Sequence, residues 1–226
     1  MDYELDTATK YGLFWGGACI EDEDGTVLAD GLYLYQPQRF STTFFLLFDK
    51  LRQLNDYCFN QLISSEVKLL ELTTQKAAAI ARKDGGAEEL DYLDDQIPIW
   101  EDNVEVVAKT IPIVLLFSFV EWGLKLVSKE FCGSIPHKAA RSISDFEFLL
   151  RHIQQNSPLQ LDITGDLIPA INSFRKIRNA FAHGHWESLA TQLSAISLRT
   201  CFEVVSRLFQ RIEESAWLSP WGKTSC

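Results

Sequence analysis

A stretch without glycine or proline, from residue 44 to residue 82, constrains the fold of this chain more than any other feature. Its apolar side chains recur close to the 3.6-residue period of an α-helix, which predicts one long helix. These side chains are Phe44, Leu47, Phe48, Leu51, Leu54, Phe59, Leu62, Ile63, Leu69, Leu70 and Leu72. Ser41, Thr42 and Thr43 precede the stretch and are N-cap candidates.

The rest of the chain continues the helical pattern in shorter pieces. A helical pattern resumes at residue 87 and runs to residue 109, and Pro98 should kink or divide it. Thr110 and Pro112 suit the start of the next helix, which is apolar nearly all round to Phe119, runs to about Cys132 and is expected at the centre of the core. Three more helices are expected, at about 143–155, from 167 to the capping glycine Gly184, and at about 189–216. The sequence thus predicts an all-α, up-and-down helical bundle.

The first 40 residues differ from the rest of the chain because they do not show the helical pattern. Glycines interrupt two aromatic-rich apolar stretches between residues 12 and 35, and Asp24-Gly25 lies between them. An Asp-Gly pair between two strand-like runs is a strong hairpin signal, so we expect a small β-hairpin that ends at Pro37. The expected organisation is therefore an N-terminal β-hairpin extension, 1–40, and a helical bundle, 41–226.

Composition and charge narrow the classes of function. The net charge is −10, but residues 1 to 110 hold 9 Lys and Arg against 21 Asp and Glu, whereas residues 111 to 226 hold 12 against 10. A local basic site is therefore possible in the C-terminal half. Five scattered cysteines indicate reduced thiols in a cytoplasmic protein rather than a disulfide framework or zinc site. The longest apolar run holds ten residues, 111 to 120, half of what a membrane span needs, so no membrane association is expected.

One segment has the side chains that a phosphodiester site needs. It is residues 174 to 185, Phe-Arg-Lys-Ile-Arg-Asn-Ala-Phe-Ala-His-Gly-His. An arginine offers a fixed charge and a forked set of donors for phosphate oxygens. A histidine exchanges protons near neutral pH, so it can take a proton from a ribose 2′-hydroxyl or give one to a leaving 5′-oxygen. Arg178 and His183 could therefore support cleavage of RNA without a metal or cofactor.

Arg178-Asn179 followed four residues later by His183 resembles the R-x(4–6)-H signature of HEPN domains. The resemblance covers residues 41 to 216 as architecture and 178 to 183 as motif. It implies a four- to five-helix bundle and a metal-independent endoribonuclease of a toxin–antitoxin, phage-defence or RNA-processing system. It implies that Arg178 and His183 are catalytic, that Asn179 orients them or holds the phosphate, and that two copies meet at a composite cleft.

The flanking residues complete the expected site. Arg175, Lys176 and His185 are expected to bind RNA, and His185 could replace or assist His183. Some HEPN toxins carry a tyrosine two residues after the histidine, which a partner enzyme modifies; His185 stands there, which puts that regulation in doubt. Partners implied are RNA, a second copy of the chain and a possible antitoxin or other regulatory protein.

Helix geometry favours a site that is shared between two copies of the chain. Five positions at about 100° each leave Arg178 and His183 roughly 140° apart on one helix. Either the helix frays before Gly184, or the arginine of one copy approaches the histidine of another, which predicts a homodimer. Glu121 either reaches this cleft or pairs with Lys125 one turn on, and the second alternative is favoured.

The sequence lacks the motifs of several other enzyme classes. The sequence has no Gly-rich phosphate loop, no Gly-x-Ser-x-Gly elbow and no His-Glu-x-x-His, which argues against nucleotide hydrolysis, serine hydrolysis and zinc protease chemistry. His137 and His152 lack paired carboxylates or cysteines at ligand spacing, so no metal site is expected. The alternatives to a nuclease are a non-catalytic HEPN-like module that binds RNA or protein and, as a third possibility, a structural helical adaptor.

Overall fold

The computed structural model describes residues 10–13, 20–21, 27–29, 34–82, 86–137, 143–161 and 167–224. Over this part the protein is all-α, with seven helices of nine residues or more. They are α2 (Thr42–Ala81), α3 (Ala87–Asp102), α4 (Ala108–Cys132), α5 (Asp145–Asn156), α6 (Leu167–Ala182), α7 (Trp186–Ser194) and α8 (Leu198–Leu218). A π-helical segment, η2 (Asn103–Val107), joins α3 to α4, and a last turn, α9 (Pro220–Thr224), follows α8.

The predicted N-terminal hairpin falls mostly outside the described residues. Two very short segments, β1 (Ile20–Glu21) and β2 (Val27–Ala29), pair antiparallel. The Asp24-Gly25 turn that motivated the prediction is not among the residues described. The hairpin and the boundary between 1–40 and 41–226 therefore stay predictions.

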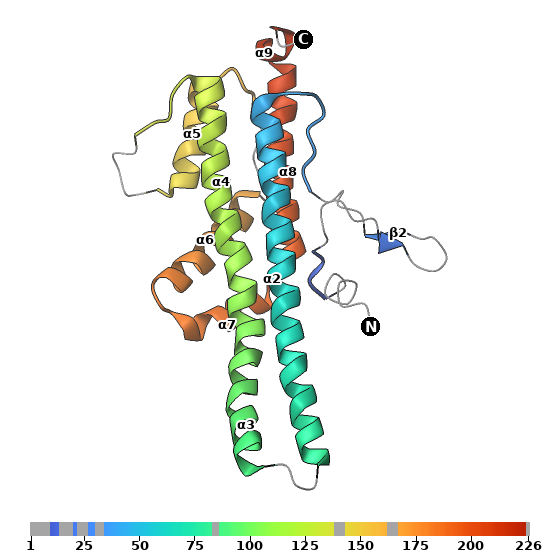
Figure 1. Ribbon diagram of the computed structural model, residues 1–226. Coiled ribbons are helices and arrows are strands. Elements are labelled where there is room, and N and C mark those ends of the chain that lie inside the picture. The colour runs from blue at the N-terminus through green and yellow to red at the C-terminus, as the bar shows by residue number, and fades with distance from the viewer. Residues whose placement is uncertain are drawn as a thin grey trace.

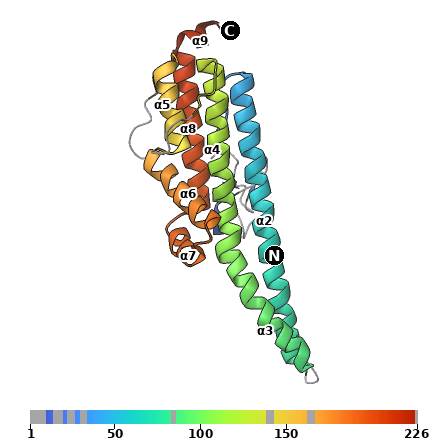
Figure 2. The same ribbon diagram turned by 90° about the vertical axis from the view of Figure 1, so that its left-hand side faces the viewer.

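Two very long helical runs dominate the shape (Figure 1). α2 has 40 residues, which corresponds to about 60 Å of helix. The run formed by α3, η2 and α4 returns antiparallel beside it, and the distal part of the pair extends beyond the other helices as an arm (Figure 2). α5, α6 and α7 lie on the other side of α4 from α2 (Figure 1).

Pro98 does not divide the second run, and the helix start predicted at Thr110 and Pro112 is wrong. α3 continues through Pro98 to Asp102, and α4 follows η2 directly, with Pro112 inside it rather than at its start. Each proline removes one backbone hydrogen bond, but apolar packing on both sides of it holds the helix together. By length and composition, one stretch of this run could cross a membrane, yet half of that stretch is buried in the fold, as in the core helix of a soluble protein.

α4 is the central helix of the main core, as its apolar sequence predicted. It packs against α2, α5, α6 and α8. Gly123 lies where α4 crosses its neighbours, because a Cβ there would be 2.5 Å from Cζ of Phe209 and 2.8 Å from Cδ2 of Leu47. Glycine thus lets the three helices approach closely.

The last predicted helix is in fact two. α7 ends at Ser194 and α8 begins at Leu198, with Ser197 extended at the N-cap position. The hydroxyl of Ser194 donates to the carbonyl of Thr191, 2.9 Å away, and this local bond competes with helix continuation. The break lets α7 pack against η2 and α4, whereas α8 runs along α4 and α2.

The segment that precedes α2 is anchored on α8 through one buried carboxylate. Glu213 is fully buried and accepts hydrogen bonds from the Tyr35 hydroxyl at 2.7 Å, the Gln38 amide at 2.9 Å and Trp217 Nε1 at 2.9 Å. Burial, together with the hydrogen bond to Glu213, raises the pKa of Tyr35 well above its usual range. Tyr35 belongs to the same hydrophobic core as the helices.

Candidate active site

The helix that carries the predicted motif, α6, is fixed by its apolar face. Leu167, Ile171, Phe174 and Ile177 are buried, and Ile168 and Phe181 pack partly buried against the same core. This is the face predicted from the sequence. It packs against α4 and α8, which leaves the opposite face of α6 to the polar residues.

The C-terminus of α6 is a Schellman turn, which positions the two histidines. Gly184 has φ +71°, the left-handed conformation predicted for a capping glycine. The His185 amide donates to the Ala180 carbonyl at 2.9 Å and the Gly184 amide to the Phe181 carbonyl at 3.2 Å. A T-shaped contact between Phe181 and Trp186, with ring centroids 5.0 Å apart, braces the turn.

His183 and His185 are both exposed and lie side by side on this turn, with ring centroids 6.4 Å apart. The His183 amide still donates to the Asn179 carbonyl at 2.9 Å, so helical geometry extends to this residue. Two accessible imidazoles at this spacing can exchange protons with one bound ligand. The helix dipole at this C-terminus favours cationic side chains.

Arg178 points toward α4. Its Nη1 donates to Asn179 Oδ1 at 3.0 Å, and its guanidinium carbon lies 5.3 Å from the centroid of the Phe117 ring. Its Nη2 is 4.0 Å from Glu121 Oε1, and its side chain remains 36% exposed. Glu121 therefore reaches the arginine, the alternative that the sequence disfavoured. A contact at this distance and exposure contributes little to stability but biases the orientation of the guanidinium.

The predicted RNA-binding cations differ in exposure. Lys176 is exposed and Arg175 is half-buried. The Arg175 Nε atom is buried and has no hydrogen-bond partner among the described residues. One turn earlier, Asn172 Nδ2 donates to Glu147 Oε1 at 2.8 Å, which ties α6 to α5.

The structure brings the predicted residues together in two groups. Arg178 and Asn179 form one group against α4, and His183 and His185 form the other at the end of α6. The His183 amide donates to the Asn179 carbonyl along the helix, but no side-chain hydrogen bond, ion pair or ring contact joins the two groups within the described part of one chain. Phe117 was not predicted from the sequence as part of the site, although its four-residue spacing from Glu121 puts both residues on one face of α4.

Metal ligands do not cluster in the part of the chain that the structure covers: no group of three or more His, Cys, Asp or Glu side chains there could hold an ion. No family model, no curated protein and no solved structure matches the chain.

Proposed function

We propose that this protein is a HEPN-like, metal-independent endoribonuclease that acts as a cytoplasmic homodimer. The observation that carries the proposal is the exposed His183–His185 pair, held by a rigid turn at the end of the helix that also carries Arg178 and Lys176. The resemblance of Arg178, Asn179 and His183 to the HEPN signature, within an all-helical fold, supports it.

The proposed reaction uses both histidines. One imidazole takes the proton of a ribose 2′-hydroxyl, and the 2′-oxygen attacks the adjacent phosphorus. The bond from phosphorus to the 5′-oxygen breaks as the other, protonated imidazole gives its proton to that oxygen. The products are a 2′,3′-cyclic phosphate and a free 5′-hydroxyl.

The cations stabilise charge in this reaction. A guanidinium donates to the phosphoryl oxygens as negative charge grows on them. Asn179 orients Arg178 through the bond that it accepts. Arg175 and Lys176 neutralise neighbouring phosphates of the strand, so binding should weaken with added salt.

The first experiment tests catalysis. Wild-type protein, His183→Ala and the control His137→Ala, which changes an exposed histidine elsewhere, are incubated with cellular RNA in EDTA. Wild type and His137→Ala should release fragments that end in 2′,3′-cyclic phosphate, and His183→Ala should release at least a hundredfold fewer, the usual contribution of general acid–base catalysis. Wild-type protein that leaves RNA intact would exclude the nuclease.

The second experiment tests the composite cleft. Arg178→Ala and His183→Ala proteins are mixed after each is shown to be inactive. If Arg178 of one copy acts with His183 of the other, half of the exchanged dimers carry one intact site, so about a quarter of the wild-type activity should return. A mixture that stays inactive would place the whole site in one chain.

One observation favours a second function. The Arg178 guanidinium is engaged by Asn179, Phe117 and Glu121, which suits a structural arginine in a non-catalytic module that binds RNA or an antitoxin-like protein. Under that function His183→Ala changes no cleavage because none exists. An RNA-binding assay on the EDTA-treated wild-type protein then distinguishes the two alternatives, because only a module that binds RNA would give a signal.

A further inference from the structure

The packing between α2 and the opposing helical run is interrupted at one place. Residues of α2 recur there at alternating spacings of four and three, the heptad spacing of packed helices. They are Cys58, Leu62, Ser65, Leu69, Leu72, Lys76 and Ala79. Cys58 and Leu62 belong to the main core, and Leu72 and Ala79 to a separate cluster in the arm. Ser65 lies between the two, where a leucine would make the apolar seam continuous.

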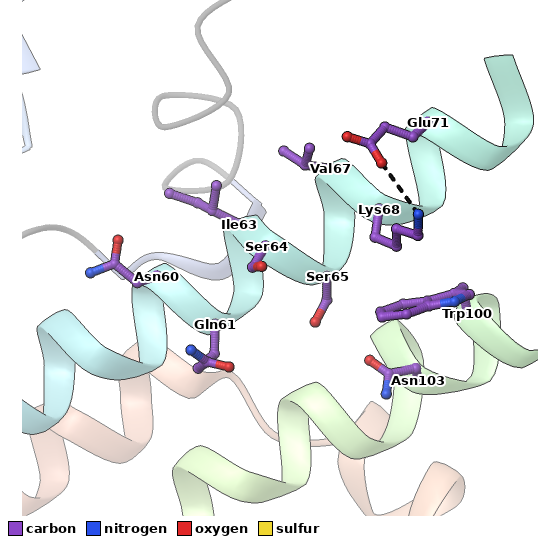
Figure 3. A pocket seen from close by; sticks show the side chains of 10 residues that line it. All are labelled: Asn60, Gln61, Ile63, Ser64, Ser65, Val67, Lys68, Glu71, Trp100 and Asn103. Carbon is purple, nitrogen blue, oxygen red and sulfur yellow. Dashed lines mark hydrogen bonds and ion pairs between the residues drawn. The ribbon is translucent and has the colours of Figure 1, made fainter. Parts of the chain in front are cut away.

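A groove of about 700 Å³ opens at this interruption (Figure 3). Gln61, Ser65 and Lys68 of α2 face Trp100 of α3 and Asn103 of η2 across it. The half-buried Trp100 packs against the arm cluster and lines the groove as well. The two sides that face each other thus offer an aromatic ring, two amides, a hydroxyl and one cation, and Asn60, Ile63, Ser64, Val67 and Glu71 complete the lining.

Three polar side chains of this groove are free to bind. Those of Gln61, Ser65 and Asn103 have no hydrogen-bond partner among the residues that the structure describes. The same three line an adjoining cavity of about 250 Å³, next to Tyr57 and Pro112. Two neighbouring cavities thus share one set of unpaired donors and acceptors.

The π-helical segment is a second, independent indication. A π-turn has poorer geometry than an α-turn and recurs in proteins at functional sites. Here it spans Asn103–Val107, where the Ala108 amide donates to the Asn103 carbonyl. The extra residue that it accommodates puts the polar Asn103 at a seam that leucine, isoleucine and valine fill elsewhere.

We propose that this groove binds a nucleobase. A flat heterocycle would stack on Trp100, and its edge would bond Gln61 and Asn103, whose amides offer both donor and acceptor as base edges require. The charge of Lys68 is offset by Glu71, whose Oε2 lies 3.4 Å from Nζ. A neutral base therefore fits this groove better than the phosphates of a nucleotide do. A purely apolar ligand would leave the donors and acceptors of Gln61 and Asn103 without partners, which costs free energy.

Two sources can supply the base. η2, which carries Asn103, packs against α2 on one side and against α7, which follows His185, on another. An unpaired base of an RNA strand held near His183 could thus reach the groove across η2; this source rests on the proposed function. A free nucleotide is the other source and does not depend on it.

The test is binding, measured by titration calorimetry. The probes are adenosine 5′-monophosphate and a 2′-O-methylated hexa-adenylate, which a 2′-hydroxyl-dependent nuclease cannot cut. The variants are Trp100→Ala and Ser65→Leu, with Tyr92→Ala as the matched control because this α3 residue is 57% exposed and does not line the groove. Ser65→Leu fills the groove with the side chain that completes the seam, so it should fold at least as stably as wild type.

Wild type and Tyr92→Ala should bind a probe equally, and both groove variants should bind it at least about tenfold more weakly, the contribution of one stacked base. Tighter binding of the hexamer than of the mononucleotide assigns the groove to RNA, and equal binding assigns it to a free nucleotide. Failure of the wild type to bind either probe, or undiminished binding by a folded Ser65→Leu variant, overturns the site. RNA that is bound through Trp100 but never cleaved would refute the nuclease and leave this site standing.

Discussion

Replacing Glu213 should show how strongly one buried carboxylate holds the N-terminal segment on α8. Glu213→Ala removes an acceptor from the Tyr35 hydroxyl, the Gln38 amide and Trp217 Nε1. A buried donor left without a partner costs about 1–3 kcal/mol, and the two part-buried donors cost less because water can reach them. We therefore expect a loss of about 3–5 kcal/mol of unfolding free energy, a large share of the 5–15 kcal/mol typical of a domain.

Glu213→Gln separates the charge from the acceptor. It keeps one oxygen for Gln38 and Trp217 and places an amide near the Tyr35 hydroxyl, so the expected loss is about 1–2 kcal/mol. Glu214→Ala is the matched control, since this neighbour accepts a single exposed bond of 3.1 Å, from the Gln210 side chain, among the residues that the structure describes. Urea unfolding followed by circular dichroism measures all three. The reasoning fails if Glu213→Ala costs no more than Glu214→Ala.

Three further predictions follow from single positions. Gly123→Ala should lower the unfolding free energy by about 1–3 kcal/mol in urea, because the new methyl meets Phe209; an unchanged midpoint would contradict the close crossing. Gly184→Ala should cost about 1–2 kcal/mol, since φ is +71° there, and should also reduce RNA cleavage by moving the turn; full stability would contradict the strain. Burial raises the pKa of Cys58 and of Cys201 to about 12. Their folded-state pKa lies above the unfolded value of about 8.5, so stability should be complete below pH 8 and fall as pH rises from about 8.5 to 12, which thermal unfolding would show. Rapid alkylation of either thiol in the native protein at pH 8 would contradict this burial.

Local signals predicted the elements that local chemistry controls. The helix from 44 to 82 is observed as α2, and the turn at Gly184 has the left-handed conformation that a glycine permits. The short helix predicted near residue 143 begins at Asp145, where the Ser144 hydroxyl accepts from the Glu147 amide. In each case a few neighbouring residues decide the conformation.

Tertiary packing determines the helix boundaries that the sequence predicted wrongly. Pro98 and Pro112 each cost one hydrogen bond, but α3 and α4 each continue past their proline because each packs against α2. The predicted helix from 189 to 216 carries no glycine or proline, yet α7 and α8 separate, and α7 then packs against η2 whereas α8 packs against α2, although both also contact α4 and α6. The groove at Trp100 could not be foreseen for a related reason: it depends on how the π-turn sets Asn103 opposite Ser65.

The local rigidity of the turn at the end of α6 is also the reason for proposing a cleft between two copies. The helical hydrogen bonding that continues to His183 keeps this side chain roughly 140° from Arg178 around the helix axis. To bring both to one phosphate within a chain, the last turn of α6 must unwind. That would break the two hydrogen bonds of the Schellman turn and the Phe181–Trp186 contact. A second copy could present its arginine while this turn stays intact, which is the reason for proposing that the cleft forms between two chains.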